Sequence, residues 1–261
     1  WFADGERFAL PEDFYSSRFL IDKTIEFIDS NLADGKPFFA YVPFQAVHLP
    51  VQAPQEYIDR YLGVYDAGWD ALREDRLTRA VQVGLLPGKV PMARMDTTGD
   101  WDALSDARKQ YESKRMAVYA GMIEAMDDNI GRLMAYLQAQ GALDNTIFVF
   151  TSDNGAEGSG PVDPLSGPNS LMTANMGYST DYETLGLKGS FSSIGPGFTS
   201  AAASPLAFYK FYTGEGGLRV PLIVSGQPLG NIPKQTDAFA WATDIAATIL
   251  ALANVALPEA R

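Results

Sequence analysis

The chain has 261 residues, of which 46% are hydrophobic, and its 32 acidic residues outnumber its 20 basic residues to give a formal net charge of −12. A chain of this length and composition can bury a hydrophobic core as one large or two small acidic domains. The acid excess repels phosphate backbones and no long basic run interrupts it, so we expect no nucleic-acid partner.

The chain contains no cysteine, which excludes a disulfide framework, a thiolate zinc site and a cysteine nucleophile within these residues. Its longest apolar runs, residues 38–44 and about 246–253, are shorter than the ~18 residues needed to cross a bilayer, so we expect no membrane span. The chain begins with Trp1 and shows no basic segment followed by an apolar one, so we expect an internal piece of a longer protein.

The first two predicted elements are a helix and a buried strand. Ile21, Ile25 and Ile28 recur at helical spacing and predict an amphipathic helix over about residues 15–31. The apolar run at 38–44 is continuous rather than alternating, which is typical of a strand covered on both faces of a largely parallel sheet. A helix that leads directly into a buried strand indicates α/β architecture.

Residues 57–113 interrupt this pattern with many charges and with clustered proline and glycine. This composition predicts short helices joined by exposed loops, as an excursion from the core. From about residue 119 to 137, hydrophobic residues again follow one helical face, which predicts a long amphipathic helix that Gly141 can end. Glu124 and Asp128 share a face of this helix and are interpreted as a solvated stripe.

A second buried strand is predicted at residues 147–151, and it runs directly into Asp153 and Asn154. Polar groups thus gather at the carboxyl end of a strand, where open α/β sheets bind their ligands. Asp153 and Asn154 offer two hard oxygen ligands of the kind that Ca²⁺ or Mg²⁺ prefers. Asp-Asn-Gly is also an ordinary turn sequence, which is the simpler interpretation of these residues taken alone.

The rest of the chain predicts loops, a third strand and a last helix. Residues 155–204 are rich in Gly, Ser and Pro with little periodicity, which favours loops over a site, with disorder as the competing interpretation. Residues 220–224 predict the third strand. Ile245, Ile249 and Leu252 define the final helix.

Two further residues could carry chemistry. His48 is the only histidine and follows the first predicted strand, so it is either a catalytic imidazole or an ordinary hydrogen-bonded side chain. Lys210 is an isolated cation among aromatic residues, and its ammonium either holds an anion or extends past its neighbours to solvent. Taken alone, each residue favours the structural interpretation.

Four motifs, in their order along the chain, resemble the type I sulfatases of the alkaline-phosphatase-like superfamily. They are residues 38–41 leading into 46–50, residues 126–131, residues 150–157 and residues 216–221. Residues 65–73 look like the bacterial arylsulfatase branch of that family, and the likeness spans most of the chain. The resemblance implies an α/β fold with a mixed, mainly parallel sheet between helices, incomplete in this chain. Residues 1–261 would form one partial catalytic domain, with 57–113 as the excursion and 155–204 as loops over the site.

The resemblance also implies roles for single residues. By match to the family motifs, Asp153 and Asn154 complete a metal site for Ca²⁺ in preference to Mg²⁺. His48 assists the leaving alcohol or a neighbouring sulfate oxygen, and Lys210 binds the sulfate. A metal ion and an ammonium group together stabilise charge on a transferring sulfuryl group, and an imidazole can supply the proton that the leaving oxygen needs.

The sequence departs from the family pattern at the nucleophile. Family members carry near the N-terminus a Cys or Ser in a Cys/Ser-x-Pro-Ser-Arg motif, which is oxidised to formylglycine. This chain has no Cys, and its nearest similar segment, at 166–170, lacks the Arg and follows the metal motif, so Ser166 is not assigned as a nucleophile. We therefore expect the formylglycine in a missing N-terminal part and expect the chain to be inactive alone.

The expected activity is hydrolysis of a sulfate ester on a small molecule or glycan. Two alternatives stay open. One is a phosphomonoester or phosphonate hydrolase of the same superfamily, whose tetrahedral anion needs similar cations, and the other is a non-catalytic, sulfatase-like binding protein. Likeness to bacterial relatives favours a periplasmic or secreted location over the cytoplasm.

Overall fold

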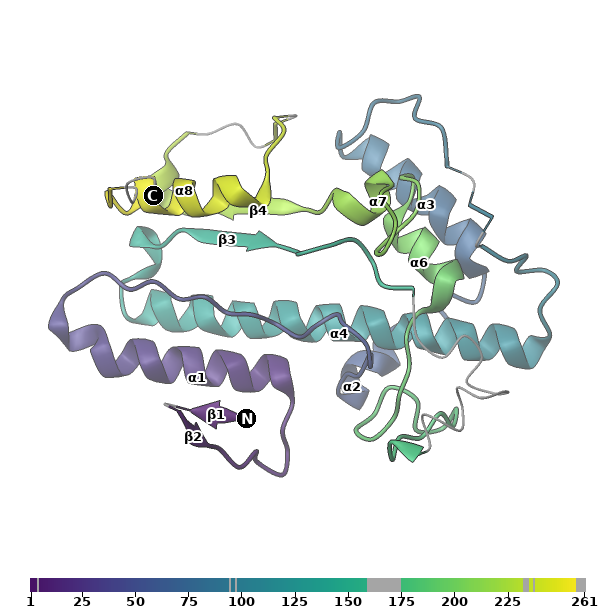
Figure 1. The fold of residues 1–261 in the computed structure, drawn as a ribbon, viewed down its shortest axis with the longest axis horizontal. Helices are drawn as coiled ribbons and strands as arrows, with labels where there is room; N and C mark the ends of the chain where they lie inside the picture. Colours follow the sequence, from purple (N-terminus) through teal and green to yellow (C-terminus); the bar gives the residue numbers. More distant parts are fainter. Residues whose placement is uncertain are drawn as a thin grey trace. The chain divides into compact units, whose positions relative to one another are not determined.

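The structure is a computed structural model, and it describes residues 1–3, 5–93, 95–96, 98–158, 175–231, 235–236 and 238–256. The chain divides into two units, Trp1–Pro228 and Leu229–Arg261, and each is considered by itself. The first unit, shown in Figure 1, holds all the residues predicted to carry chemistry. Its helices and strands are β1 (Phe2–Ala3), β2 (Glu6–Arg7), α1 (Ser16–Asn31), α2 (Gln55–Ile58), α3 (Gly68–Gln82), α4 (Asp106–Ala139), β3 (Phe148–Thr151), α6 (Gly195–Ala203), α7 (Glu215–Leu218) and β4 (Leu222–Ser225).

Helices α1 and α4 lie side by side and form one part of the hydrophobic core (Figure 1). Both predicted helices are confirmed, although α4 begins at Asp106, well before the predicted start. Ser105 caps α4, because its hydroxyl accepts a hydrogen bond from the backbone N–H of Arg108 at 3.3 Å. Gly141 follows the helix with φ +68°, the left-handed conformation that commonly ends helices. The core between the two helices consists of Ile21, Ile28, Leu133 and Leu137.

The sequence did not predict a helix at the beginning of α4, because the buried face of this segment carries charged residues. Arg115 and Glu112 are both buried, and the Arg115 Nη1 lies 2.9 Å from the Glu112 Oε1. The same guanidinium donates hydrogen bonds to the carbonyl and the hydroxyl of Ser193. Buried charged side chains are tolerated when they are paired and hydrogen-bonded. In the sequence, however, charged residues predict a solvent-exposed helix face.

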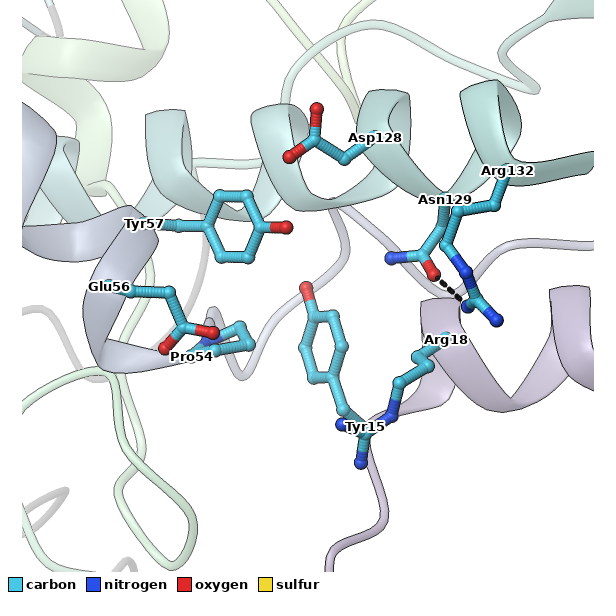
Figure 2. A pocket seen from close by; sticks show the side chains of 8 residues that line it. All are labelled: Tyr15, Arg18, Pro54, Glu56, Tyr57, Asp128, Asn129 and Arg132. Carbon is cyan, nitrogen blue, oxygen red and sulfur yellow. Dashed lines mark hydrogen bonds between the residues drawn. The ribbon is translucent and has the colours of Figure 1, made fainter. Parts of the chain in front are cut away.

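A pocket of about 180 Å³ lies where α4 meets α2 and the start of α1. Figure 2 shows the phenol rings of Tyr15 and Tyr57 directing their hydroxyls into it. The Tyr15 hydroxyl is buried and has no hydrogen-bond partner among the described residues. Burial therefore raises the pKa of Tyr15 from 10.0 to about 12, because the phenolate is less well solvated than the neutral phenol.

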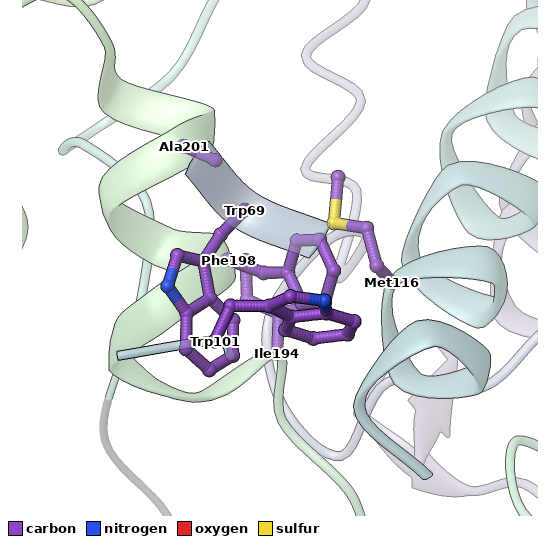
Figure 3. Close-up of a cluster of buried hydrophobic side chains, with 6 residues drawn as sticks. All are labelled: Trp69, Trp101, Met116, Ile194, Phe198 and Ala201. Carbon is purple, nitrogen blue, oxygen red and sulfur yellow. The ribbon is translucent and has the colours of Figure 1, made fainter. Parts of the chain in front are cut away.

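A second part of the core is aromatic and packs against α6 (Figure 3). The rings of Trp69 and Trp101 meet edge to face with centroids 4.8 Å apart, and the Phe198 ring lies 5.7 Å from Trp69. Both tryptophans come from residues 57–113, so part of this expected excursion packs into the core instead of leaving it. The remaining buried members are Met116, Ile194 and Ala201.

The segment 155–204, expected to form loops over the site, contains the helix α6, and this corrects the expectation for residues 195–203. Small residues allow α6 to approach its neighbours closely. A Cβ atom added to Gly197 would lie only 2.4 Å from the Trp69 ring. Helical packing through small residues leaves no periodic pattern of large apolar residues for prediction to use. Residues 159–174, which include Ser166, lie outside the described residues.

The strands β3 and β4 form a small sheet. They pair antiparallel, with Phe148 opposite Ser225 and Thr151 opposite Leu222. Strands were predicted at these two places, and both are confirmed. The pairing within the described residues is antiparallel, where mainly parallel pairing was expected, and the side chains of β4 are exposed rather than covered. Helices and this sheet together give the expected α/β class.

Residues 38–44 do not form a strand in the described structure, so the prediction of a buried strand there is wrong. The Phe39 side chain is 73% exposed and Tyr41 is 80% exposed. A strand needs a neighbour for its backbone N–H and C=O groups, and no described strand pairs with this segment. The apolar run still contributes Val42 and Phe44 to the core between α1 and α4.

The second unit contains helix α8 (Ala242–Leu252), which confirms the predicted final helix. The side chain of Asp244 accepts a hydrogen bond from the backbone N–H of Trp241 at 2.8 Å and so caps the start of α8. Across the described parts of the chain, no helix is both long enough and apolar enough to span a bilayer.

Tyr15 makes the stability of the fold sensitive to alkaline pH. The buried neutral phenol contributes stability that is fully present below its unfolded pKa of about 10 and is lost as the pH rises to the folded value of about 12. We expect Tyr15→Phe to remove this part of the alkaline loss, which is at most about 3 kcal/mol. Urea unfolding of wild type and variant across this pH range measures the difference. The control Tyr41→Phe, at an exposed side chain, should follow wild type, and parallel curves for Tyr15→Phe and wild type would contradict the expectation.

The aromatic core predicts a large loss of stability on truncation of Phe198, which is fully buried. We expect Phe198→Ala to lower the free energy of unfolding by about 3–5 kcal/mol, because the change leaves a cavity beside the two tryptophans. Phe39→Ala, at an exposed phenylalanine, should change it by less than about 1 kcal/mol. Urea denaturation of both variants tests this, and equal losses would show that the aromatic cluster is not the core.

Candidate functional site

The end of β3 leads into Asp153 and Asn154, as predicted. The Asn154 amide donates a hydrogen bond to the Asp153 Oδ1 at 2.7 Å, and the Ser152 hydroxyl donates to the Asn154 carbonyl at 2.9 Å. The Asp153 side chain is exposed and Asn154 is half-buried. The segment is thus a hydrogen-bonded turn that also presents carboxylate and amide oxygens beyond the strand.

Gly155 joins this turn to the short helix α7, which precedes β4. Its backbone N–H donates to the Gly217 carbonyl at 2.9 Å. A Cβ atom at Gly155 would lie 1.9 Å from the Gly216 carbonyl oxygen, so no larger residue fits without a shift of the backbone. This contact of backbone with backbone holds the two segments together.

The loop that carries Lys210 is fixed by the same neighbours. The Lys210 backbone N–H donates to the Ala156 carbonyl at 3.0 Å, and the Gly216 N–H donates to the Ala207 carbonyl at 2.8 Å. On either side of Lys210, Phe208 has φ +66° and Phe211 has φ +77°, conformations that are unfavourable for residues with a side chain. Such backbone conformations occur where the surrounding structure imposes them, often at functional sites.

His48 and Lys210, which are 162 residues apart in the sequence, meet in the structure. The Lys210 Nζ lies 3.2 Å from the His48 Nε2, and the His48 Nδ1 lies 2.8 Å from the Leu49 carbonyl oxygen. A carbonyl only accepts hydrogen bonds, so these partners assign the proton to Nδ1 and make Nε2 the acceptor for the ammonium. The structure therefore places a cation and an imidazole side by side.

Glu157 is a third member of this group, and the sequence assigned it no role. Its Oε2 lies 2.8 Å from the Lys210 Nζ, and the side chains of Lys210 and Glu157 are only 18% and 10% exposed. The Thr199 hydroxyl donates to the Glu157 carbonyl at 3.1 Å, which ties the residue to α6. Glu157 lies inside the motif 150–157, but nothing in that motif indicates that its partner is Lys210.

The four predicted site residues thus form two pairs. Within the part of the chain that the structure describes, no hydrogen bond or ion pair joins Asp153 or Asn154 to His48 or Lys210 directly. The connection runs through the backbone of Gly155 and Ala156.

Asp153 and Asn154 offer the kind of oxygen ligand that a hard divalent cation prefers, but two residues are too few to complete its coordination shell. Carboxylate and amide oxygens are the ligands that Ca²⁺ prefers, and Ca²⁺ takes about six to eight of them. Among the described residues, no three His, Cys, Asp or Glu side chains gather closely enough to hold a metal ion. These residues would therefore hold only part of the coordination shell.

The group around Lys210 can bind an anion and move a proton. An ammonium has three N–H donors. Among the described residues, two of them are directed at His48 and Glu157, and Nζ lies 5.4 Å from the centroid of the exposed Phe211 ring, so one N–H can serve a ligand oxygen. An imidazole beside a bound ester can exchange a proton with its leaving oxygen. A tetrahedral oxyanion ester is the substrate that suits this combination of groups.

Comparison with known proteins defines the family. The profile of the sulfatase family matches residues 2–255, and the chain belongs to this family. It is 40% identical over 253 residues to an uncharacterized sulfatase of Schizosaccharomyces pombe, covering 95% of this chain and 44% of that protein. It is 32% identical over 255 residues to an arylsulfatase of Klebsiella aerogenes, covering 97% of this chain and 53% of that protein. The chain thus spans about half the length of these curated relatives.

A solved structure confirms the fold. The crystal structure of Ps i-CgsB in complex with k-i-k-neocarrahexaose superposes with a TM-score of 0.54 at 21% identity, covering 98% of this chain and 37% of that chain. A likeness at this identity shows the fold alone, and the chain accordingly has the α/β, alkaline-phosphatase-like fold of the sulfatases.

The contact at Gly155 yields a prediction. We expect Gly155→Ala to lower the free energy of unfolding by about 1–3 kcal/mol, because the added methyl group collides with the Gly216 carbonyl. Gly131→Ala in α4 is the matched control, since nothing lies within 4 Å of the added methyl group and alanine favours the helix. Urea unfolding of the two variants should give changes of opposite sign, and two changes of the same sign would contradict this account of Gly155.

Proposed function

We propose that this chain carries part of the catalytic site of an enzyme that hydrolyses sulfate esters. The observation that carries the proposal is the Lys210 ammonium, held 3.2 Å from the His48 imidazole on a loop fixed beside the end of β3. Membership of the sulfatase family supports the reaction class.

In this proposal Lys210 binds a sulfate oxygen through its remaining N–H donor. A charge-assisted hydrogen bond from an ammonium to an oxyanion is stronger than one between neutral groups, and it stabilises negative charge that builds up during the reaction. His48 acts through Nε2, because Nδ1 is held by the Leu49 carbonyl. In the resting site Nε2 accepts from Lys210, so it would first exchange this contact for a proton from solvent. The imidazolium then donates that proton to the leaving alcohol oxygen or to a neighbouring sulfate oxygen.

We further propose that Asp153 and Asn154 are ligands of a Ca²⁺ ion, in preference to Mg²⁺. When bound, the cation would supply positive charge to the sulfate oxygens. The two residues lie side by side in the turn after β3, and the remaining ligands would come from other parts of the protein.

The nucleophile of the proposed reaction is a formylglycine outside these residues. Two facts support this: the chain contains no cysteine, and its curated relatives are about twice as long as the region that matches it. We accordingly propose that the 261-residue chain does not turn over sulfate esters by itself. The parent protein, meaning the polypeptide encoded by the complete gene, would do so.

The substrate of the parent protein is proposed to be a sulfated small molecule or glycan. Phe211 supports a substrate with a ring, because its side chain is 74% exposed and its ring centroid lies 5.4 Å from the Lys210 Nζ. An exposed aromatic face beside an anion site can pack against an aryl group or a sugar. By likeness to bacterial sulfatases, we propose a periplasmic or secreted location.

The proposal is tested by assaying the parent protein with an aryl sulfate ester in the presence of Ca²⁺. We expect sulfate release by wild type and a loss of about 10²–10³-fold in kcat for Lys210→Met, since an electrostatic contact to the reacting anion is removed. The control Lys36→Met removes a cation whose side chain is 79% exposed and should retain full activity. Absence of sulfate release by wild type would refute the proposal, and a preference for phosphate esters would favour a phosphohydrolase.

A further inference from the structure

Glu157 is a residue of this site to which the sequence analysis assigned no role. We propose that Glu157 is a positioning residue, whose carboxylate holds the Lys210 ammonium against His48 and orients its third N–H towards the sulfate. The inference rests on the proposed function of Lys210 and adds a residue that is not in contact with substrate.

The geometry of the ammonium group is the first argument. Nζ lies 2.8 Å from the Glu157 Oε2 and 3.2 Å from the His48 Nε2. Three N–H donors on one nitrogen are arranged tetrahedrally, so fixing two of them fixes the direction of the third. Without Glu157, the described contacts of the ammonium would be the imidazole and the face of the Phe211 ring. Neither fixes the direction of a second N–H, so the ammonium could rotate on its flexible four-carbon stem. The carboxylate provides the second fixed point.

The attachment of Glu157 itself is the second argument. Its carbonyl is bound by the hydroxyl of Thr199, which is fully buried in α6. Its neighbour Ala156 accepts the backbone N–H of Lys210 at 3.0 Å. Its other neighbour, Gly158, is packed so closely that an added Cβ would lie 2.9 Å from the Tyr209 ring. Lys210 is therefore bound twice to the same short segment, by its backbone to Ala156 and by its side chain to Glu157.

Charge is the third argument. The Lys210 and Glu157 pair is formally neutral, so the carboxylate weakens the attraction of the site for an anionic ester while it orders the ammonium. The pair is largely buried, so removing the carboxylate leaves the Lys210 ammonium without the counter-charge of Glu157. Glu157→Gln should therefore bind the substrate at least as well as wild type, in the ground state, but hold it less well aligned for reaction.

This reasoning predicts a split between the kinetic constants of the parent protein. We expect Glu157→Gln to lower kcat for an aryl sulfate about 10–100-fold, because a misplaced catalytic contact costs up to about 10²-fold. We expect KM to fall, because removing the carboxylate strengthens the attraction of the site for the anionic ester. Glu157→Asp keeps the charge on a shorter side chain and should recover part of kcat. A loss of folding alone would lower the active fraction without changing KM, and would not be relieved by aspartate.

Glu215→Gln is the matched control. Glu215 begins the short helix α7 and forms an exposed ion pair with Arg219, with 3.2 Å between Nη1 and Oε2. The substitution removes the same charge without touching Lys210 and should leave kcat within about twofold, since exposed ion pairs contribute little. If Glu157→Gln also keeps kcat within about twofold, the positioning role is refuted.

A second measurement does not depend on turnover. In the parent protein labelled with ¹⁵N-histidine, the pair of side-chain nitrogen resonances that His48→Gln removes belongs to His48. At mildly alkaline pH, where an ordinary imidazole is neutral, we expect a protonated Nδ1 and an Nε2 that accepts from Lys210. Glu157→Gln should shift the Nε2 resonance, as Lys210→Met does, whereas Glu215→Gln should not.

The two measurements separate the failure of the inference from the failure of the proposed function. If the wild-type parent releases no sulfate but Glu157→Gln shifts the His48 resonance, the proposed function fails while Glu157 still positions Lys210. If the resonance is unchanged in Glu157→Gln and shifted in Lys210→Met, the inference is refuted whatever the activity. If Glu157→Gln does not fold, Glu157→Asp still moves the carboxylate away from Nζ and should shift the His48 resonance by a smaller amount in the same direction. No shift in Glu157→Asp would then refute the inference.

Discussion

The site depends on the contact between the backbone of Gly155 and that of Gly216 and Gly217. Gly155 donates to the Gly217 carbonyl at 2.9 Å, and there is no room for a side chain between the segments. The contact sets the turn with Asp153 and Asn154 beside the loop that carries Lys210. Because it joins main chain to main chain, it defines the spacing of the segments more tightly than contacts between flexible side chains would.

The aromatic core supports the same site through helix α6. Helix α6 carries Thr199, which binds the Glu157 carbonyl, and it is itself held by the aromatic core around Phe198. A chain of rigid contacts therefore runs from the buried tryptophans to the ammonium of Lys210. Polar groups supported in this way lose little freedom when they bind a ligand, which is how an enzyme keeps charges oriented towards the reacting atoms.

Prediction succeeded where a pattern is local and failed where a partner is distant. Helix α1 follows from the spacing of its own isoleucines. Residues 38–44 have the composition of a buried strand, but strand formation requires a neighbour, and none of the described strands pairs with them. Helix α6 was missed because glycine and alanine pack closely without leaving a periodic apolar pattern, and the start of α4 because its buried face includes paired charges.

The sequence by itself determined the chemical inventory: one histidine, a lysine among aromatic residues, adjacent aspartate and asparagine after a strand, and no cysteine. The order of the motifs also indicated the sulfatase family, to which the chain belongs. Only the tertiary structure decided that Lys210 meets His48 and that Glu157 holds it. The reason is physical: a hydrogen bond between side chains 162 residues apart depends on how the intervening backbone folds, and residue type alone carries no information about that distance.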